Sequence, residues 1–383
     1  MPKQSFNFAL FLFIYYAFAS VFATYASLFF AERGMSAPQI GILMSLIQVM
    51  RIVGPNLWGW VADHTRQRVR VLRITALAGL AAFSGIFYGH TFAQLFAAMV
   101  VFNLFTSAQA PLSEALMVDE MRGDLSQYGR IRLWGSVGFI VSVTAAGYGL
   151  EWFGVAALPW MAGALLAGVL AASLRIRESP HHAHAQPAPP LLGVLRQPAV
   201  IAFFGQAALM VAAHTSLYVF YSLYLERSGY SKPVIGAMWS LGVLAEVVFF
   251  YFQAAFFKRV AARRLLMAAF AVAVLRFIVI GAGAEWLLVL VLAQLLHAAT
   301  FAAHHSASIM TMQRWFAGPL QASGQALYIS LAYGVGGTVG SLFMSLCWEA
   351  LGPQAVYYAA AALALAGAGA AALSQRWQEP APA

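Results

Sequence analysis

Long apolar runs recur along the whole chain, and they constrain its fold more than any other feature. A helix needs about 20 apolar residues to cross the roughly 30 Å hydrocarbon core of a membrane. Twelve such runs follow one another at residues 6–31, 37–62, 71–89, 92–118, 129–150, 155–175, 197–225, 233–257, 264–283, 286–312, 322–348 and 354–374. We therefore expect an all-α polytopic membrane protein with twelve transmembrane helices.

Composition supports this interpretation. Only 9% of the 383 residues are charged and 62% are hydrophobic, whereas soluble domains carry about 25% charged residues. Residues 6–31 are too long and too aromatic for a cleaved signal peptide, so we interpret them as the first span. The single cysteine, Cys347, excludes an intramolecular disulfide and any cysteine-based zinc site.

One polar segment, residues 177–196, divides the chain into two halves. It is rich in proline and polar residues, which is typical of a flexible linker. Its histidines, His181, His182 and His184, are interpreted as solvated side chains, with metal binding as the alternative. We expect an N-terminal six-helix bundle at 1–176, a cytoplasmic linker at 177–196 and a C-terminal six-helix bundle at 197–383.

The distribution of basic residues predicts the orientation. With both termini in the cytoplasm, 17 of the 22 Lys and Arg residues are cytoplasmic and 3 are outside, a strong positive-inside bias. We therefore expect a multi-pass protein of the bacterial inner membrane, with both termini cytoplasmic. Anionic lipid at the cytoplasmic surface accounts for the net charge of +9. Membrane lipid is thus an expected partner and nucleic acid is not, and we expect a monomer.

The two halves are related in sequence. Residues 34–41, GMSAPQIG, recur as residues 229–236, GYSKPVIG, at an offset of 195. The same offset takes Arg51 to Glu246 and Arg68 to Arg263. A repeat of half the chain length is typical of transporters that bind substrate near the membrane midplane between two repeats. This repeat predicts two pseudo-symmetric bundles around a central site.

Charged side chains inside spans are costly, so they point to a functional site. They are Arg51 in the second span, Glu114 in the fourth, Arg132 at the start of the fifth, Glu246 in the eighth and Arg276 in the ninth. The alternative is that Arg51 with Glu114, and Glu246 with Arg276, form purely structural ion pairs. Both halves contribute charges, which favours the functional interpretation.

The tenth span adds three histidines. At α-helical spacing, His297 and His304 share a face, while His305 lies about 100° further round. A histidine changes charge between pH 5 and 8, and a buried carboxylate can titrate in the same range. Glu246, Glu114 and His297 are therefore candidates for proton coupling. His304 is open to a second interpretation, as a hydrogen-bonded core residue.

Aromatic side chains and glycines accompany these charges. Candidates to line a cavity are Tyr15, Tyr16, Tyr25, Tyr218, Tyr221, Trp134, Phe139 and Trp239. Anchoring at the membrane interface is the alternative for each of them. The glycines at 135, 138, 334, 336, 337 and 340 are typical of close helix packing in membranes.

Residues 59–68, GWVADHTRQR, resemble the loop between the second and third helices of the major facilitator superfamily. The segment departs from that pattern in one respect. The pattern has a glycine two residues before its last pair of basic residues, and this segment, with Arg66 and Gln67 in that region, lacks it. The resemblance extends over nearly the whole chain, and it implies the twelve-helix major facilitator fold. It also implies that Asp63, with Arg66 and Arg68, braces helices at the cytoplasmic gate and does not bind substrate.

Within that superfamily the chain is similar to the lactose permease branch. The similarity lies in residues 110–115, APLSEA, and 128–136, YGRIRLWGS. It implies a substrate-binding role for Glu114 and Arg132, and a proton-coupling role for Glu246, Arg276 and His297. Two departures matter. Thr300 stands where that branch has an acidic residue, which favours Glu246 as the proton site. Phe139 replaces the tryptophan that stacks on sugar.

The 3-phenylpropionate permease group matches more closely. Residues 130–137, RIRLWGSV, 239–247, WSLGVLAEV, and 296–301, LHAATF, resemble segments of that group, Thr300 included. The resemblance implies proton-coupled symport of a small organic solute, with an aromatic monocarboxylate such as 3-phenylpropionate as substrate.

The charge count points the same way. Arg51, Arg132 and Arg276 outnumber Glu114 and Glu246 by one, and a guanidinium suits a carboxylate. The alternatives are symport of a sugar or nucleoside, drug or metabolite efflux, and a membrane enzyme or scaffold. No metal cluster or Ser/His/Asp arrangement stands out in the sequence, so we expect no enzyme and no cofactor besides the proton gradient.

Overall fold

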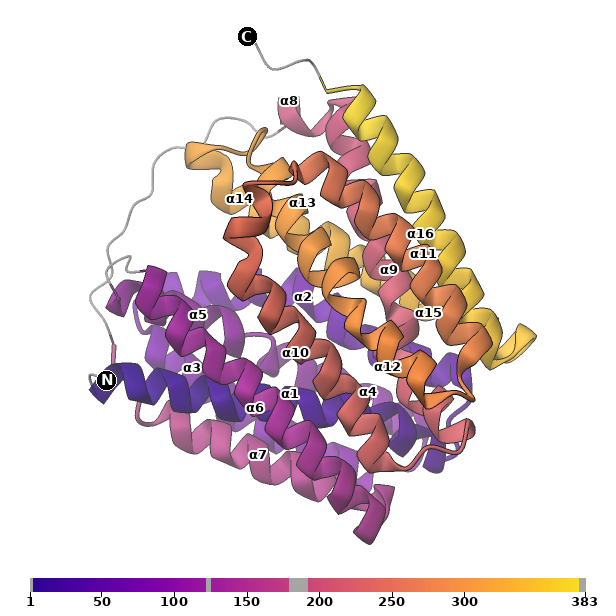
Figure 1. Cartoon of the computed structure of the whole chain (residues 1–383). Coiled ribbons are helices and arrows are strands. Elements are labelled where there is room, and N and C mark those ends of the chain that lie inside the picture. The colour runs from indigo at the N-terminus through magenta and orange to yellow at the C-terminus, as the bar shows by residue number, and fades with distance from the viewer. Residues whose placement is uncertain (1–2, 122–124, 179–191, 379–383) are drawn as a thin grey trace. The chain divides into compact units, whose positions relative to one another are not determined.

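The computed structural model describes residues 3–121, 125–178 and 192–378, and every regular element in these ranges is a helix (Figure 1). Twelve helical segments in the described ranges are long and apolar enough to cross a membrane. The predicted all-α fold of twelve transmembrane helices is therefore confirmed.

The first six spans are built from eight elements. They are α1 (Lys3–Glu32), α2 (Ala37–Thr65), α3 (Arg68–Tyr88), α4 (Phe92–Thr106) with α5 (Gln109–Glu120), α6 (Leu125–Phe153), and the short η1 (Val155–Ala157) with α7 (Leu158–Ser173). Local signals set several of these ends. Before α4, Thr91 accepts a hydrogen bond from the Gln94 amide, and the Gln94 side chain accepts one from the Thr91 amide. This capping box explains why the helix begins there.

The last six spans contain two interruptions. A short α8 (Leu192–Leu195) precedes α9 (Pro198–Arg227), α10 (Lys232–Phe257) and α11 (Ala262–Gly283). The tenth span combines α12 (Leu287–Leu295), a π-helical segment η2 (Ala298–Ala303) and α13 (His304–Met312). After η3 (Gly318–Leu320), the eleventh combines α14 (Gln321–Tyr328), a second π-helical segment η4 (Ile329–Gly336) and α15 (Gly337–Leu351), and α16 (Pro353–Arg376) is the twelfth.

The chain forms two compact units. Unit 1 contains residues 1–184 and 219–240, and unit 2 contains residues 185–218 and 241–383. Each of the helices α9 and α10 is therefore divided between the two units. The predicted linker at 177–196 falls largely on residues 179–191, which lie outside the described ranges. The domain boundaries expected there stay a prediction.

In unit 1, α1 is the central element, and it packs against α6 and α7. Glycine allows this close approach, because a Cβ at Gly138 of α6 would clash with the carbonyl oxygen of Phe13. The first turns of α10 also belong to this unit. The Tyr25 hydroxyl lies 3.1 Å from the carbonyl oxygen of Lys232 and 3.1 Å from that of Val143.

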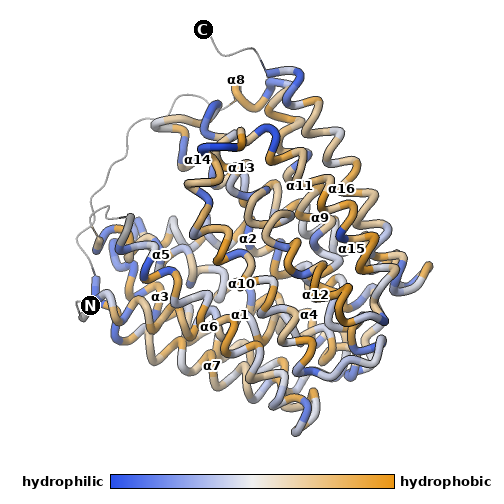
Figure 2. Tube along the Cα trace, in the orientation of Figure 1, coloured by the Kyte–Doolittle hydropathy of each residue, from blue (hydrophilic) through white to orange (hydrophobic). Residues whose placement is uncertain are grey.

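In unit 2, α11 packs along α16 and also contacts α12, η2 and α13 (Figure 1). Apolar residues cover most of the lengths of these helices, and the end of α16 next to the C-terminus is hydrophilic (Figure 2). This pattern is the one expected of helices whose middles lie in hydrocarbon. The packing brings residues of α10, α11 and the tenth span together around one buried arginine.

Candidate functional site

Arg276, on α11, is the centre of a polar cluster inside unit 2. Its side chain is fully buried, with 0% exposure. Its Nε donates to the carbonyl oxygen of Ala293 at 2.7 Å, and its Nη2 donates to Gln294 Oε1 at 2.6 Å. A buried guanidinium is tolerated only where its donors are satisfied, and here backbone and side-chain acceptors surround it. The guanidinium is therefore held in one orientation.

His297 links this arginine to a carboxylate. Its Nδ1 lies 2.9 Å from Arg276 Nη1, and its Nε2 lies 2.7 Å from Glu246 Oε1. Because a guanidinium can only donate, Nδ1 must be the acceptor, and the proton of the neutral imidazole is then on Nε2. His297 thus donates to Glu246. The result is a chain of hydrogen bonds from Arg276 through His297 to Glu246, in which the imidazole fixes the position of the carboxylate.

Thr300 extends the cluster to α9. Its hydroxyl accepts from Arg276 Nη1 at 2.9 Å and lies 3.2 Å from His214 Nε2. His214 Nδ1 lies 2.8 Å from the carbonyl oxygen of Met210, which makes Nδ1 the donor and leaves Nε2 as the acceptor. The position that carries an acidic residue in the lactose permease branch therefore holds a hydroxyl that connects two basic side chains.

The π-helical segment η2 corrects one expectation about the tenth span. Phe301 stacks on His297 at 5.5 Å and 12°, and His305 stacks on Phe301 at 6.3 Å and 11°. His305, and not His304, therefore continues the column that begins at His297. His304 is directed elsewhere, and its Nε2 lies 2.9 Å from Gln206 Oε1. The three stacked residues follow one another at intervals of four, a spacing that makes side chains neighbours along a helix.

A second polar cluster lies in unit 1, where Arg132 of α6 meets α1 and α5. Its Nη2 donates to the Tyr16 hydroxyl at 2.7 Å, and its Nε lies 3.4 Å from Glu114 Oε1. The guanidinium carbon also lies 4.3 Å from the centre of the Tyr16 ring. The side chains of Arg132 and Glu114 are 34% and 36% exposed. The pair is thus oriented by Tyr16 and remains accessible.

Glycine shapes this second cluster. A Cβ at Gly135 would lie 2.7 Å from the Tyr16 ring and 2.9 Å from Arg132 Nη1, so only glycine leaves room for their contact. Tyr15 packs edge-on against Tyr16, with ring centres 5.2 Å apart. Arg51, on α2, is exposed and interacts electrostatically with Tyr15. The cluster therefore contains five residues that the sequence singled out, namely Tyr15, Tyr16, Glu114, Arg132 and Gly135.

The remaining aromatic candidates are dispersed. Phe139 is half-buried on α6. Trp239 is half-buried in unit 1, where its Nε1 donates to Ser222 Oγ at 3.2 Å. Tyr218, on α9, lies 6.2 Å from His214 between ring centres and belongs to unit 2. Their predicted contact with substrate stays a prediction.

The three predicted gate residues, Asp63, Arg66 and Arg68, differ in their burial and in their ion pairs. Asp63 and Arg66 are exposed, and within the described ranges neither forms an ion pair. Arg68 is buried and binds Asp119 at 2.6 Å and Glu178 at 3.3 Å. The ion pair of Arg68 with Asp119 thus joins the start of α3 to the end of α5. Asp63 takes no part in that ion pair in this structure. Arg66 has a positive φ of 52° at the end of α2.

Three residues of these networks were missed from the sequence, namely Gln294, Asp119 and Glu178. Gln294 lies one turn before His297, which is the available signal, but glutamine alone indicates no function. Asp119 lies near a helix end, where acidic residues are common. No group of three or more His, Cys, Asp or Glu side chains in the described part of the chain is placed to hold a metal ion.

Comparisons with known proteins identify the family of the chain. The sequence profile of the MFS_1 like family matches residues 5–359. The probable 3-phenylpropionic acid transporter of Escherichia coli (strain K12) is 30% identical over 370 residues, which cover 93% of this chain and 94% of that protein. The maltose permease of Geobacillus stearothermophilus is 37% identical over 144 residues, 37% of this chain and 36% of that protein.

Solved structures extend the likeness to the fold. The nucleoside transporter NupG superposes with a TM-score of 0.86 at 17% identity, over 99% of this chain and 100% of that chain. At this identity the likeness concerns the fold alone. The family match covers most of the chain, and the relatives are transporters. The chain therefore belongs to the MFS_1 like family of the major facilitator superfamily, and it is a multi-pass membrane transporter and not an enzyme.

Proposed function

We propose that the protein is a proton-coupled symporter that takes up a small aromatic monocarboxylate, such as 3-phenylpropionate, across the bacterial inner membrane. The observation that carries the coupling is the hydrogen-bond chain from Arg276 through His297 to Glu246. In this chain the Glu246 carboxylate is the last hydrogen-bond acceptor, and it lies within a span. A carboxylate can accept a proton. Intramembrane carboxylates in such chains serve as proton relays in transporters.

The proton changes the charge of this cluster. With Glu246 ionised, its negative charge offsets that of Arg276, and His297 between them is neutral. Proton binding to Glu246 removes that negative charge, so the net charge of the cluster around Arg276 becomes more positive by one. A more positive site binds an anion more tightly, and an anion in turn favours the protonated state. This reciprocal effect couples the proton to a carboxylate substrate.

The substrate class rests on three observations. Arg132 presents a guanidinium that Tyr16 orients and that is partly exposed, and a guanidinium binds a carboxylate through two parallel hydrogen bonds. The 30% identical relative from Escherichia coli bears the name of a probable 3-phenylpropionic acid transporter. Tyr15 and Tyr16 supply flat apolar faces beside the guanidinium. These features support a carboxylate joined to an aromatic body.

Substituting Glu246→Gln tests the coupling. Glutamine keeps the shape and still accepts the hydrogen bond from His297 Nε2, but it cannot take up a proton. We expect uphill, proton-driven uptake into membrane vesicles to be lost, while counterflow exchange of substrate remains. The matched control is Glu285→Gln, which changes an exposed carboxylate outside the cluster and should leave both activities unchanged. Uphill accumulation at the wild-type level in Glu246→Gln would refute the assignment.

A neutral sugar is the second candidate substrate, and one observation favours it. The maltose permease of Geobacillus stearothermophilus is 37% identical over 144 residues, although these cover only 37% of this chain. In that case Arg132 and Glu114 would hold sugar hydroxyls together. The reciprocal charge effect described above acts on an anion and not on a neutral sugar, so comparing the two substrates in the vesicle assay separates the two candidates.

A further inference from the structure

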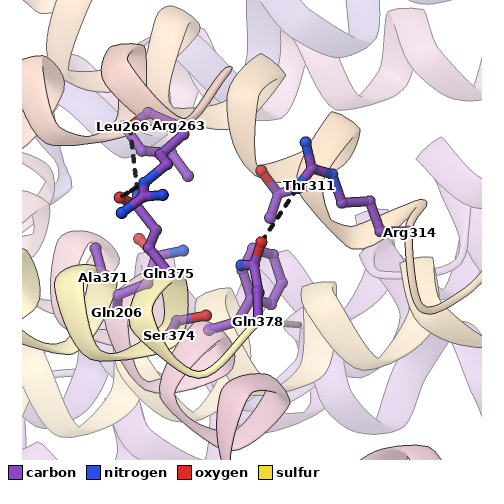
Figure 3. A pocket seen from close by; sticks show the side chains of 10 residues that line it. Gln206, Arg263, Leu266, Thr311, Arg314, Ala371, Ser374, Gln375 and Gln378 are labelled. Carbon is purple, nitrogen blue, oxygen red and sulfur yellow. Dashed lines mark hydrogen bonds between the residues drawn. The ribbon is translucent and has the colours of Figure 1, made fainter. Parts of the chain in front are cut away.

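A small pocket opens at one end of unit 2, where four helices meet (Figure 3). It lies among the first part of α9, the start of α11, the end of α13 and the end of α16. The side chains that line it are Phe203, Gln206, Arg263, Leu266, Thr311, Arg314, Ala371, Ser374, Gln375 and Gln378. Its enclosed space is about 10 Å³, close to the volume that admits a single water-sized atom. None of these residues belongs to the clusters around Arg276 or Arg132.

The floor of the pocket offers unused hydrogen-bond donors. Gln206 is 1% exposed, and its Oε1 is engaged by His304 Nε2 at 2.9 Å. Its amide nitrogen has no hydrogen-bond partner within the described ranges. An unsatisfied buried donor costs about 1–3 kcal/mol, so such a group indicates a missing acceptor. A bound oxygen atom would supply that acceptor.

Two arginines stand at the rim. Arg263 Nε donates to Gln375 Oε1 at 2.8 Å, and Arg314 Nη1 donates to Gln378 Oε1 at 3.1 Å (Figure 3). Both partners are neutral amides. Across the described ranges, neither arginine forms an ion pair with a carboxylate. Each guanidinium carries five N–H donors, so most of these remain available to a ligand.

The internal repeat explains why this pocket differs from its counterpart in unit 1. The offset of 195 residues relates Arg68 to Arg263 and Asp119 to Arg314. In unit 1, Asp119 accepts from Arg68 at 2.6 Å, so that half supplies its own anion. In unit 2 a second arginine stands at the position of the aspartate. Unit 2 therefore has no aspartate at the position where Asp119 neutralises Arg68, and an external anion can take that place.

We propose that this pocket binds a phosphate-type oxyanion, either the headgroup phosphate of an anionic phospholipid or free inorganic phosphate. One phosphate oxygen enters the small space and accepts from the Gln206 amide. The other oxygens stay at the mouth, where the guanidiniums of Arg263 and Arg314 bind them. Arginine suits phosphate because its planar donors match the oxygen geometry. The site lies at the ends of four membrane helices, where lipid headgroups are present.

Two arms of one experiment distinguish the sources. In the first, inorganic phosphate is titrated by calorimetry into the full-length protein in a neutral detergent. In the second, the protein in nanodiscs of phosphatidylcholine, with or without phosphatidylglycerol, is released and its retained lipids are counted by native mass spectrometry. Binding in the first arm identifies the soluble anion, and selective retention of phosphatidylglycerol identifies the lipid. Absence of binding in both arms overturns the proposal.

The variants are chosen to separate a specific site from general positive charge. Arg263→Gln removes one guanidinium. Arg314→Asp places an aspartate at the position in unit 2 that corresponds to Asp119, so that Arg263 can form the same kind of ion pair as Arg68 does in unit 1. Both should weaken anion binding about ten- to a hundredfold, because hydrogen bonds to a charged group are lost. Arg264→Gln is the matched control, because Arg264 is an exposed neighbour that does not line the pocket. An equal loss in Arg264→Gln, or no loss in the other two, contradicts the proposal.

A last variant tests whether the chain supplies the anion itself. Glu379 follows Gln378 and lies outside the described residues. We expect Glu379→Gln to bind the phosphate-type anion as the wild type does. If binding is detected only in Glu379→Gln, the chain's own carboxylate is the natural occupant and the proposal is wrong.

Discussion

At the residue scale, Arg132 is the side chain whose surroundings say most about the substrate. Tyr16 and Glu114 hold the guanidinium by hydrogen bond and ion pair, yet the Arg132 side chain is 34% exposed. A guanidinium held in this way is oriented before the ligand arrives, which reduces the entropy lost on binding. Its planar donors are therefore expected to select a carboxylate over a neutral group.

Arg132→Lys and Arg132→Gln test this expectation. Lysine keeps the charge but loses the planar pair of donors, and glutamine loses both. A charge-assisted hydrogen bond contributes about 1.5–3 kcal/mol, so Arg132→Gln should lose about ten- to a hundredfold in affinity, and Arg132→Lys less. Calorimetric titration of phenylpropionate-like acids measures the effect. Arg130→Lys, at an exposed position two residues earlier, is the control and should bind as the wild type does.

The same titration has an outcome that would contradict the proposal. If aromatic acids give no heat with the wild-type protein while a neutral sugar or nucleoside binds, the carboxylate proposal fails. Arg132 and Glu114 would then act as a neutral pair toward hydroxyl groups.

Single residues were predictable from the sequence where a charge lies in an apolar run. Arg132, Glu114, Glu246 and Arg276 all stood out for that reason, and the structure places them in two polar clusters. Their partners were harder to predict. Tyr16 and Gln294 belong to residue types that occur for many reasons in membrane helices. Only three-dimensional contact distinguishes an aromatic anchor from one that orients a guanidinium.

At the element scale, the π-helical segment η2 is what the sequence could not reveal. Residues 298–303, AATFAA, have no proline or glycine to signal an interruption. His305 joins the column of His297 and Phe301 through successive contacts four residues apart. Spacing alone left both His304 and His305 near that face and did not tell which of them would join the column. Irregular turns of this kind arise from packing between helices, which single-helix periodicity does not contain.

Close packing of α1 against α6 gives an element-scale prediction. Gly138→Ala would place a methyl group against the carbonyl oxygen of Phe13, which is backbone and cannot turn away. We expect a loss of about 1–3 kcal/mol in the free energy of unfolding, as for other overpacked sites. Thermal unfolding in detergent measures it.

The control lies on the same helix. Gly129 has no atom within 4 Å of an added Cβ, so Gly129→Ala meets open space. Alanine is also the better helix former by about 1 kcal/mol, so this variant should be as stable as the wild type or more so. Equal stability of Gly138→Ala and Gly129→Ala would show that the two helices separate at no cost.

At the scale of the whole molecule, the number and order of spans followed from the sequence. The offset of 195 residues that aligns GMSAPQIG with GYSKPVIG also carries Ala37–Thr65 onto Lys232–Phe257 and Phe92–Glu120 onto Leu287–Met312. Membrane helices are predictable because each must satisfy its own backbone and bury about 20 apolar residues. The division into compact units was less predictable, since Val219–Ser240 joins unit 1 through tertiary contacts such as that of Tyr25 with Lys232.

The orientation of the chain is the last prediction, and it rests on charge. Seventeen of the 22 Lys and Arg residues fall on the side that carries both termini, against three on the other. The positive-inside rule then places the termini in the cytoplasm. Because Cys347 is the only cysteine, a Cys347→Ser background allows single cysteines to be introduced one at a time. Ala383→Cys should react with a membrane-impermeant maleimide only in inside-out vesicles. Glu285→Cys, in the exposed turn between α11 and α12, should react only in right-side-out vesicles or intact cells. The reverse pattern would place the termini outside, and the basic residues would then require an explanation other than orientation.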